Sequence, residues 1–136
     1  MDKKQLSEAD IRSKFIDPAI LQAGWSETHQ IYREYAITNG RIVVRGQKAQ
    51  RNMQTALRAD YLLCYQFGQP LAVMEAKDNR HTVGAGIQQA TEYAERMGVP
   101  FAFASNGDGF VFRDATLADG QLIREISLDE FPSPQD

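Results

Sequence analysis

Apolar residues near the amino terminus recur at helical spacing. Ile11 and Phe15 lie on one face of a helix that Ser7 can cap, with acidic residues in its first turn. Pro18 fits poorly inside a helix, but it can occupy the first position of a new helix that Asp17 caps. The pattern therefore predicts a kinked or broken pair of helices.

Two hairpins are predicted next, each from two runs rich in β-branched and aromatic residues. The first joins residues 29–37 to residues 41–45 through an Asn-Gly turn, which is a strong hairpin signal. The second joins residues 59–67 to residues 71–77 through Gly68-Gln69-Pro70. Both pairs are expected to be antiparallel.

The rest of the chain predicts a helix followed by strands. Apolar residues recur at helical spacing over residues 87–97, and Gly98 stands where that helix should end. Residues 99–105 and 110–113 are typical of buried strands, and an edge strand pair is expected within residues 117–128. Strand, helix, strand implies a right-handed parallel crossover. The predicted fold is α/β: a mixed central sheet of antiparallel hairpins plus one parallel crossover, flanked by helices.

Composition is that of an ordinary globular domain, with 136 residues of which 43% are hydrophobic and 24% charged. No apolar run approaches the roughly 18 residues needed to cross a membrane, and no secretory signal is recognisable. The single cysteine, Cys64, excludes an internal disulfide and a zinc finger. We expect a cytoplasmic domain over residues 1–130, with a linker starting at Phe131-Pro132-Ser133-Pro134.

Charge is unevenly distributed along the chain. The net charge is −3, yet the stretch from Arg41 to Arg58 contains five basic residues and no acidic one. Such a stretch can be merely a solvated loop, but its sign also suits the phosphate backbone of DNA. The candidate phosphate contacts are Arg45, Lys48 and Arg51.

Three charged side chains converge at the open end of the second hairpin. Taking Gly68-Gln69 as the turn places Asp60 opposite Lys77. In the same register Leu62 lies opposite Glu75. Because side chains alternate between the faces of a strand, Asp60, Glu75 and Lys77 project from one side. The two carboxylates could bracket one cation, whereas an ion pair between Asp60 and Lys77 would be a purely structural arrangement.

Two carboxylates and a backbone oxygen suit Mg²⁺, which prefers oxygen ligands. Such an ion can activate a water and neutralise charge on a phosphodiester, and Lys77 could contact the same phosphate oxygens. The basic stretch leads directly into the strand that carries Asp60. These features together indicate metal-dependent cleavage of DNA.

Asp60 followed by Glu75-Ala76-Lys77 resembles the D…E-x-K signature of the PD-(D/E)XK nucleases. A wider similarity, to the N-terminal endonuclease domain of the R (motor) subunit of type I restriction-modification enzymes, covers nearly the whole chain. The segments that carry it are Glu8-Ala9-Asp10-Ile11-Arg12, Ile16-Asp17-Pro18, Ala23-Gly24-Trp25, Arg58-Ala59-Asp60-Tyr61, Leu71 to Lys77, and Gln89-Ala90 through Tyr93-Ala94.

The resemblance implies roles for the central residues. Asp60 and Glu75 would be Mg²⁺ ligands and Ala76 would lend its carbonyl oxygen. Lys77 would orient the attacking water or stabilise the transition state.

The resemblance also implies auxiliary residues. Gln89 and Tyr93 match the Q-x-x-x-Y motif of the family, which is associated with DNA contact or cleavage; a polar helix face is the alternative. Glu8 matches a helix glutamate that joins the metal shell in many PD-(D/E)XK nucleases, although an acidic residue at a helix start has a structural reason as well.

At the level of the complex, the resemblance implies a double-stranded DNA substrate and, through the full R subunit, methyltransferase and specificity subunits as partners. ATP would be used only by motor domains, and no G-x-x-x-x-G-K-[ST] motif occurs in this sequence. Two other functions remain open. One is a free-standing repair or junction nuclease, and the other is a DNA-binding or docking module without activity.

Neutralising Arg45, Lys48 and Arg51 together should weaken binding of the full R subunit to any DNA sequence. The slope of log affinity against log salt concentration should fall by up to about three, roughly 0.9 for each duplex phosphate that the protein no longer neutralises. An unchanged slope in a folded variant would identify the stretch as a solvated loop.

Overall fold

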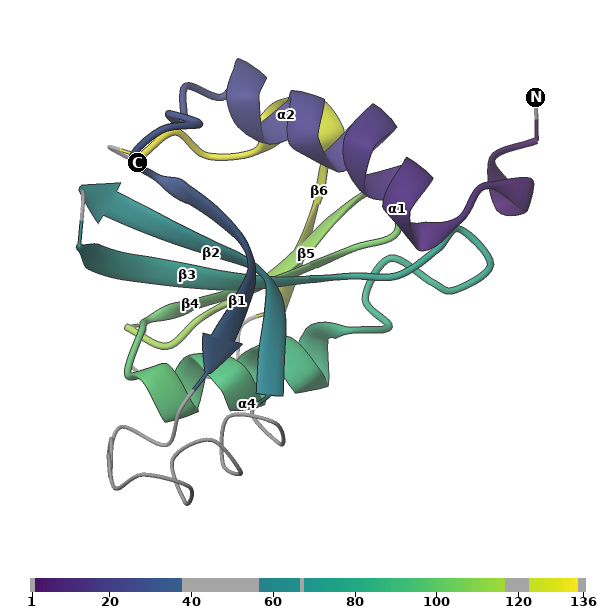
Figure 1. Ribbon diagram of the computed structural model, residues 1–136. Helices are drawn as coiled ribbons and strands as arrows, with labels where there is room; N and C mark the ends of the chain where they lie inside the picture. Colours follow the sequence, from purple (N-terminus) through teal and green to yellow (C-terminus); the bar gives the residue numbers. More distant parts are fainter. Residues whose placement is uncertain (1, 38–56, 67, 117–122, 135–136) are drawn as a thin grey trace, which may run out of the picture.

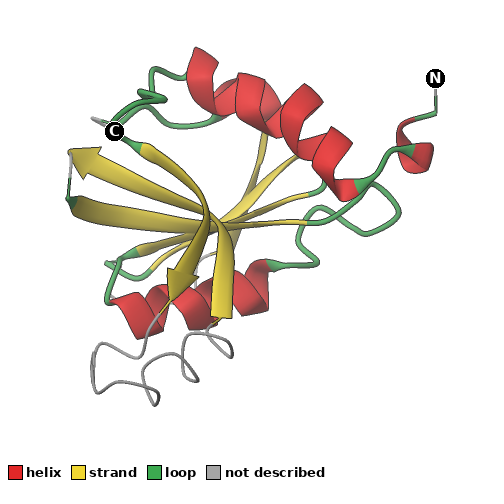
Figure 2. Cartoon of the chain, viewed as in Figure 1, coloured by secondary structure: helices red, strands yellow, loops and turns green. Residues whose placement is uncertain are grey.

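A six-stranded mixed sheet separates two helical layers in the computed structural model, which describes residues 2–37, 57–66, 68–116 and 123–134 (Figures 1 and 2). The strands follow chain order across the sheet: β1 (Ile31–Ile37), β2 (Leu57–Gln66), β3 (Gln69–Ala76), β4 (Phe101–Ser105), β5 (Gly109–Asp114) and β6 (Ile123–Ser127). Helices α1 (Glu8–Ile11) and α2 (Asp17–Gln22) cover one face, and α4 (Ile87–Met97) covers the other. Short 3₁₀ helices span Lys3–Gln5 and Leu128–Glu130.

The pairing of the strands confirms the predicted fold class. β3 and β4 are parallel and are joined through α4, whereas the other neighbouring strands are antiparallel. Gly98 ends α4 in the left-handed conformation, with φ of 71°. The edge strand β6 pairs with β5, and residues 117–122 of the predicted edge pair lie outside the described residues. The Asn-Gly turn and residues 41–45 lie outside them as well.

The amino-terminal helices differ from the prediction. Ser7 caps α1 as expected, accepting a hydrogen bond from the Asp10 N–H at 3.1 Å. The break at Pro18 is absent, because a π-type turn over residues 12–16 keeps the chain helical and the Asp17 N–H bonds the Arg12 carbonyl. Asp17 does not cap a new helix, since it has helical backbone angles itself and its carboxylate is used elsewhere.

The register of the second hairpin also differs, by two residues. Tyr61 pairs with Met74, and continuing this register places Asp60 across from Glu75 rather than from Lys77. The turn closes earlier than expected, because Gln66 already pairs with Gln69 and Gly68 takes a positive φ of 81°. A shift by two residues still leaves Asp60 and Glu75 next to each other at the end of the hairpin.

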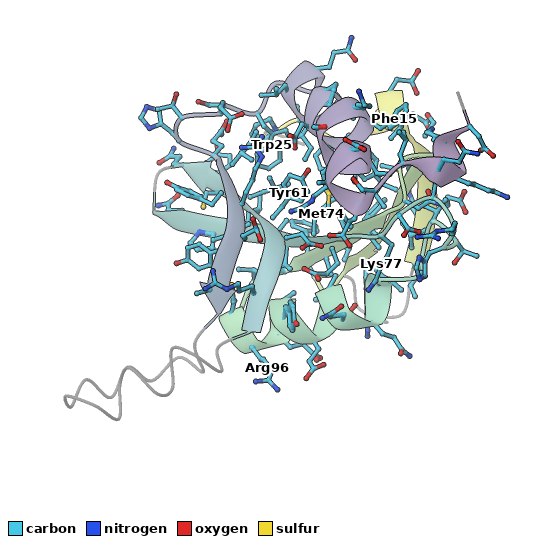
Figure 3. All side chains as sticks on the ribbon, turned by 45° about the vertical axis from the view of Figure 1, so that its right-hand side comes forward. Phe15, Trp25, Tyr61, Met74, Lys77 and Arg96 are labelled. Atoms are coloured by element: carbon cyan, nitrogen blue, oxygen red, sulfur yellow. The ribbon has the colours of Figure 1, made fainter. Side chains whose placement is uncertain are left out.

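Apolar side chains pack on both sides of the sheet, which explains why its central strands are continuously apolar. Along β2, Tyr61 and Leu63 point to the α1–α2 layer, whereas Leu62 and Cys64 point to α4. Figure 3 shows Tyr61 and Met74 beneath the amino-terminal helices. None of the described helices is both long and apolar enough to traverse a bilayer.

The segment predicted to start a linker packs into the core. Phe131 is 5% exposed, and its ring centroid lies 4.6 Å from that of Phe110 and 4.9 Å from that of Phe103. Trp25 donates a hydrogen bond from Nε1 to the Pro132 carbonyl at 2.8 Å. The folded domain therefore continues past residue 130, because this aromatic cluster would be incomplete without Phe131. A junction towards motor domains stays a prediction.

Phe131→Ala should lower the free energy of unfolding by about 3–5 kcal/mol, because it empties a packed aromatic site. Urea denaturation of the chain measures the change. Leu21→Ala is a suitable control, since Leu21 is 43% exposed and its truncation should cost well under 1 kcal/mol. Equal stability of the Phe131 variant and the wild type would restore the linker interpretation.

Candidate active site

Two carboxylates face each other where β2 begins and β3 ends. The regular pairing of these strands stops at Tyr61 and Met74, next to Asp60 and Glu75. Beyond this point the two carboxylates, instead of backbone carbonyls, accept hydrogen bonds from the N–H groups of the opposite strand. Glu75 Oε2 accepts a hydrogen bond from the Asp60 N–H at 2.9 Å, and Asp60 Oδ2 accepts one from the Ala76 N–H at 2.7 Å. Each carboxylate is thereby held in one orientation and keeps its second oxygen for another partner.

The environment of the two carboxylates disfavours their negative charges, because Glu75 is buried and Asp60 is half-buried. Glu75 is 4% exposed, and burial together with the charge of Asp60 raises its pKa to about 7. Burial also raises the pKa of Asp60, against the effect of the hydrogen bond from Ala76 and of nearby cations. The pair therefore carries charge that the surrounding protein does not fully compensate.

Glu8 lies near this pair, at the start of α1. Burial and the charge of Asp60 raise its pKa, whereas the charges of Arg12 and Lys77 lower it. Within the part of the chain that the structure describes, no three acidic, histidine or cysteine side chains gather closely enough to hold a metal ion. The folded chain thus presents a carboxylate pair with Glu8 beside it, and a metal-binding role for Glu8 stays a prediction.

Lys77 stands just beyond β3, in the segment that leads to α4 (Figure 3). Its charge favours the ionised forms of Asp60 and Glu75. The ion pairs among the described residues do not join Lys77 to Asp60, so the purely structural pairing is not observed. All three charged residues share one end of the hairpin, as predicted, but with Asp60 opposite Glu75.

Buried amides fix the loop that follows Lys77. Asn79 donates from Nδ2 to the Asn106 carbonyl at 2.9 Å, and Asn106 donates from Nδ2 to the His81 carbonyl at 2.6 Å. The Lys77 N–H itself donates to the Ser105 carbonyl at 3.0 Å. The β4–β5 turn therefore holds the loop, and with it the backbone of Lys77, in one position.

The α1–α2 layer is fastened to β2 beside Asp60. The Tyr61 hydroxyl donates to Asp17 Oδ1 at 2.6 Å, and Tyr61 is fully buried. Burial and this carboxylate raise the pKa of Tyr61, so the hydroxyl stays a donor. Asp17 also lies 3.4 Å from the guanidinium of Arg33 on β1. Asp17 therefore joins the Ile16-Asp17-Pro18 segment to β1 and to the strand that carries Asp60.

The start of α4 packs closely against Glu75 from the other layer. A Cβ atom at Gly86 would lie 3.2 Å from the Cβ of Glu75 and 3.8 Å from that of Ala104. A side chain at Gly86 would therefore require Glu75 to shift by a few tenths of an ångström.

Gln89 and Tyr93 form one unit on α4. Gln89 Nε2 donates to the Tyr93 hydroxyl at 2.7 Å. Tyr93 is 5% exposed and belongs to the core between α4 and the sheet, whereas Gln89 is exposed. A polar surface face therefore describes Gln89 but not Tyr93, and their contact with DNA stays a prediction. Arg45, Lys48 and Arg51 lie outside the described residues.

Two site residues were not predicted from the sequence. Glu34 stands in β1 across from Asp60, between residues paired with Tyr61 and Ala59, and has a positive φ of 48°. Its charge raises the pKa of Asp60. Only the β1–β2 register, which no sequence signal supplied, brings Glu34 here. Arg12 lies 3.8 Å from Glu8, and its spacing of four residues from Glu8 on a helix could have indicated this contact.

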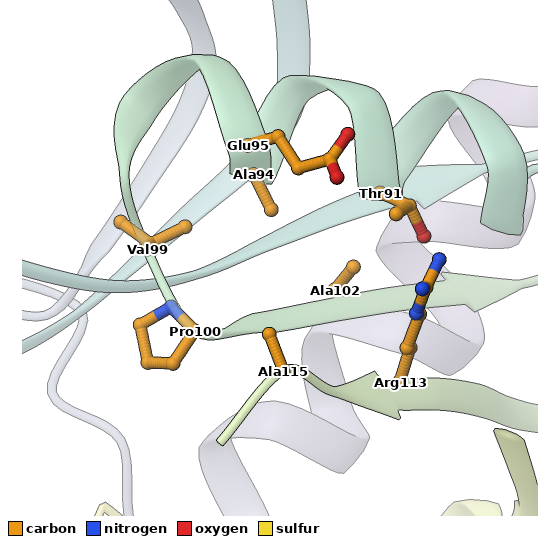
Figure 4. Close-up of a pocket in the computed structure, with 8 residues that line it drawn as sticks. All are labelled: Thr91, Ala94, Glu95, Val99, Pro100, Ala102, Arg113 and Ala115. Atoms are coloured by element: carbon orange, nitrogen blue, oxygen red, sulfur yellow. The ribbon is translucent and has the colours of Figure 1, made fainter. Parts of the chain in front are cut away.

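A small pocket of about 240 Å³ lies elsewhere, between α4 and strands β4 and β5 (Figure 4). Apolar residues such as Val99 and Ala102 line it, with Glu95 on one side and Arg113 reaching towards Thr91. None of the candidate catalytic side chains lines this pocket.

Comparisons with known proteins agree on one family. A family model described as the N terminus of type I restriction enzyme R proteins matches residues 43–121. The chain is 50% identical over 135 residues to the endonuclease subunit of type I restriction enzyme EcoAI from Escherichia coli, covering 98% of this chain and 16% of that subunit.

A solved structure gives the same result. It is a fragment described as an HsdR subunit of a type I restriction enzyme from Vibrio vulnificus YJ016, with a TM-score of 0.77 and 37% identity over 96% of this chain and 24% of that chain. The chain thus spans only a minor part of the relatives it matches. Because the family model covers more than half of the sequence, the chain belongs to the family of N-terminal regions of type I restriction enzyme R proteins.

Proposed function

We propose that this chain is a Mg²⁺-dependent nuclease module that hydrolyses phosphodiester bonds of double-stranded DNA. The observation that carries the proposal is the opposed pair of Asp60 and Glu75. The two carboxylates lie beside each other and are fixed by backbone amides, with Glu75 buried and Asp60 half-buried. This burial raises the pKa of both groups. An enzyme that must recruit a divalent cation needs such a pair, whereas a structural role would be served better by apolar residues.

The donor set fits Mg²⁺. This ion takes oxygen ligands, keeps several waters and is usually bound through one or two carboxylates together with substrate phosphates. Asp60 and Glu75 would supply two carboxylate oxygens, and the backbone carbonyl of Ala76 is the third oxygen we assign. A cation here would lower the raised pKa of Glu75 towards its ordinary range.

The chemistry follows from the placement of the charged groups. When bound, Mg²⁺ supplies a water of lowered pKa and neutralises charge on the phosphate. Asp60 and Glu75 hold the ion at the end of the hairpin, and Lys77 stabilises the negative oxygens of the phosphate from the adjacent loop. The hydrogen bonds of Asn79 and Asn106 hold in place the loop that follows Lys77.

The wider activity belongs to a larger protein. The named Escherichia coli relative is an endonuclease subunit of a type I restriction enzyme, and this chain spans 16% of it. We propose that the module cleaves DNA as part of a complete R protein, in a complex with methyltransferase and specificity subunits. ATP use and translocation would reside in other domains of that protein.

Asp60→Asn and Glu75→Gln should each reduce DNA cleavage by the complete R protein in its complex by at least about 10²–10³-fold. Both amides keep a carbonyl oxygen for the backbone hydrogen bond, so folding should be retained, but neither supplies a negative ligand. ATP hydrolysis should stay unchanged, because the motor is a separate part. Cleavage is measured on plasmid DNA.

Glu92→Gln is the matched control for these variants, since it removes an exposed charge on α4 and should leave cleavage unchanged. Wild-type cleavage by either amide variant would contradict the proposed metal ligands. Such a result would favour a DNA-binding or docking module.

Glu75→Gln should be more stable than the wild type at pH 8 and about equally stable near pH 4.5. The pKa of Glu75 rises from 4.5 to about 7 on folding, so its contribution to stability is present at low pH and is lost as the pH rises through 7. Because the amide does not ionise, the free energy of unfolding of Glu75→Gln should exceed that of the wild type by about 1–3 kcal/mol at pH 8.

Urea denaturation in EDTA-containing buffer at the two pH values measures this difference. Glu92→Gln, whose exposed ion pair with Arg96 contributes at most a few tenths of a kcal/mol, should show no gain at pH 8. Equal stability of the wild type and Glu75→Gln at pH 8 would mean that the charge of Glu75 is already compensated.

A further inference from the structure

Arg12 brings a second cation to the site from the layer opposite Lys77. It is the first residue of the π-type turn, between α1 and α2 in the helical run that covers one face of the sheet (Figure 1). Its Nη2 atom lies 3.8 Å from Glu8 Oε2, which is too long for a hydrogen bond. The charge of Arg12 nevertheless favours ionisation of both Asp60 and Glu8, and it acts on Asp60 more strongly than the charge of Lys77 does.

The hydrogen-bonding capacity of Arg12 is poorly used within the folded chain. Its Nε atom is buried and has no hydrogen-bond partner among the described residues. The side chain as a whole is 20% exposed. A buried donor without a partner costs free energy, and an arginine kept only for structure would normally form a bidentate pair with a carboxylate.

The partners around Arg12 do not account for this arrangement. Glu8 stands at ion-pair distance but is not bound to the guanidinium. Asp60 uses Oδ2 for the Ala76 N–H. A guanidinium held partly desolvated, with acceptors near but not bound, is suited to an acceptor that arrives with the substrate.

We propose that Arg12 binds a non-bridging oxygen of the DNA phosphate at the cleavage site, facing Lys77 across the carboxylate pair. This inference rests on the proposed nuclease function and adds a substrate-binding residue to it. The terminal nitrogens of the guanidinium make the contact, while a bound cation would give Asp60 the countercharge that Arg12 gives it in the free protein. Glu8 then serves to aim the guanidinium.

The test compares Arg12→Gln, Arg12→Lys and Lys14→Gln in the complete R protein. Lys14→Gln removes the same charge from an exposed position two residues further along the same helical run. Arg12→Gln should lower cleavage by about 10²–10³-fold and reduce the slope of log DNA affinity against log salt concentration by about 0.9. Lys14→Gln should change neither quantity.

Arg12→Lys keeps the charge but loses the planar fork, so it should keep the salt slope of DNA binding and lower cleavage by about tenfold. Glu8→Gln should leave the salt slope unchanged, because Glu8 touches no phosphate. If Arg12→Gln fails to fold by circular dichroism, the cleavage rate of Arg12→Lys decides: a loss supports the contact and a wild-type rate overturns it.

Wild-type cleavage or an unchanged salt slope in folded Arg12→Gln would overturn the inference. The Asp60→Asn variant separates this failure from failure of the nuclease function. If Asp60→Asn is inactive and Arg12→Gln is not, only the role of Arg12 is wrong. If Asp60→Asn cleaves like the wild type, the proposed metal site itself is wrong.

Discussion

The hydrogen bonds that Asp60 and Glu75 accept across the β2–β3 hairpin determine the rest of the site. Each carboxylate takes an amide that the strand ladder would otherwise use, so the strands separate without leaving these buried donors unpaired. The same bonds hold the two carboxylates beside each other, in an environment that opposes their negative charges. These two hydrogen bonds therefore both separate the strands and hold two negative groups close together, where a cation would be stabilised. The proposed chemistry depends on both effects.

Each of the two helical layers contributes one contact that supports this pair. From the α1–α2 layer, Asp17 accepts the hydroxyl of Tyr61, the residue next to Asp60. From the other layer, Gly86 at the start of α4 approaches the Cβ of Glu75. The buried amides of Asn79 and Asn106 add a third support, because they join the loop after Lys77 to the β4–β5 turn. The carboxylates therefore belong to the hairpin, but their surroundings are built by the whole domain.

The hairpin that brings Asp60, Glu75 and Lys77 to one end could be predicted from the sequence, because its apolar runs and its turn residues are local signals. The register of the second hairpin was wrong by two residues, yet Asp60 and Glu75 still meet at the end of the hairpin, with Lys77 just beyond it. The burial of Phe131 was not predicted, because a Pro-rich segment has the composition of a linker even where it packs against aromatic residues of the core. The place of Glu34 depends on the pairing of β1 with β2, which local patterns do not encode. The contact of Arg12 with Glu8 is local and could have been inferred from their spacing on a helix.

The π-type turn over residues 12–16 brings apolar residues before and after it to the same side of the amino-terminal helical run. Ile11 and Ile16 are both fully buried, although five residues of a regular α-helix would rotate them apart by roughly 140°. A wider turn brings such residues closer to one face. The run can therefore keep its apolar side on the sheet along its length and still turn Glu8 and Arg12 towards the strand end. The wider turn thus lets Glu8 and Arg12 face a different direction from the apolar residues that follow the turn and pack on the sheet.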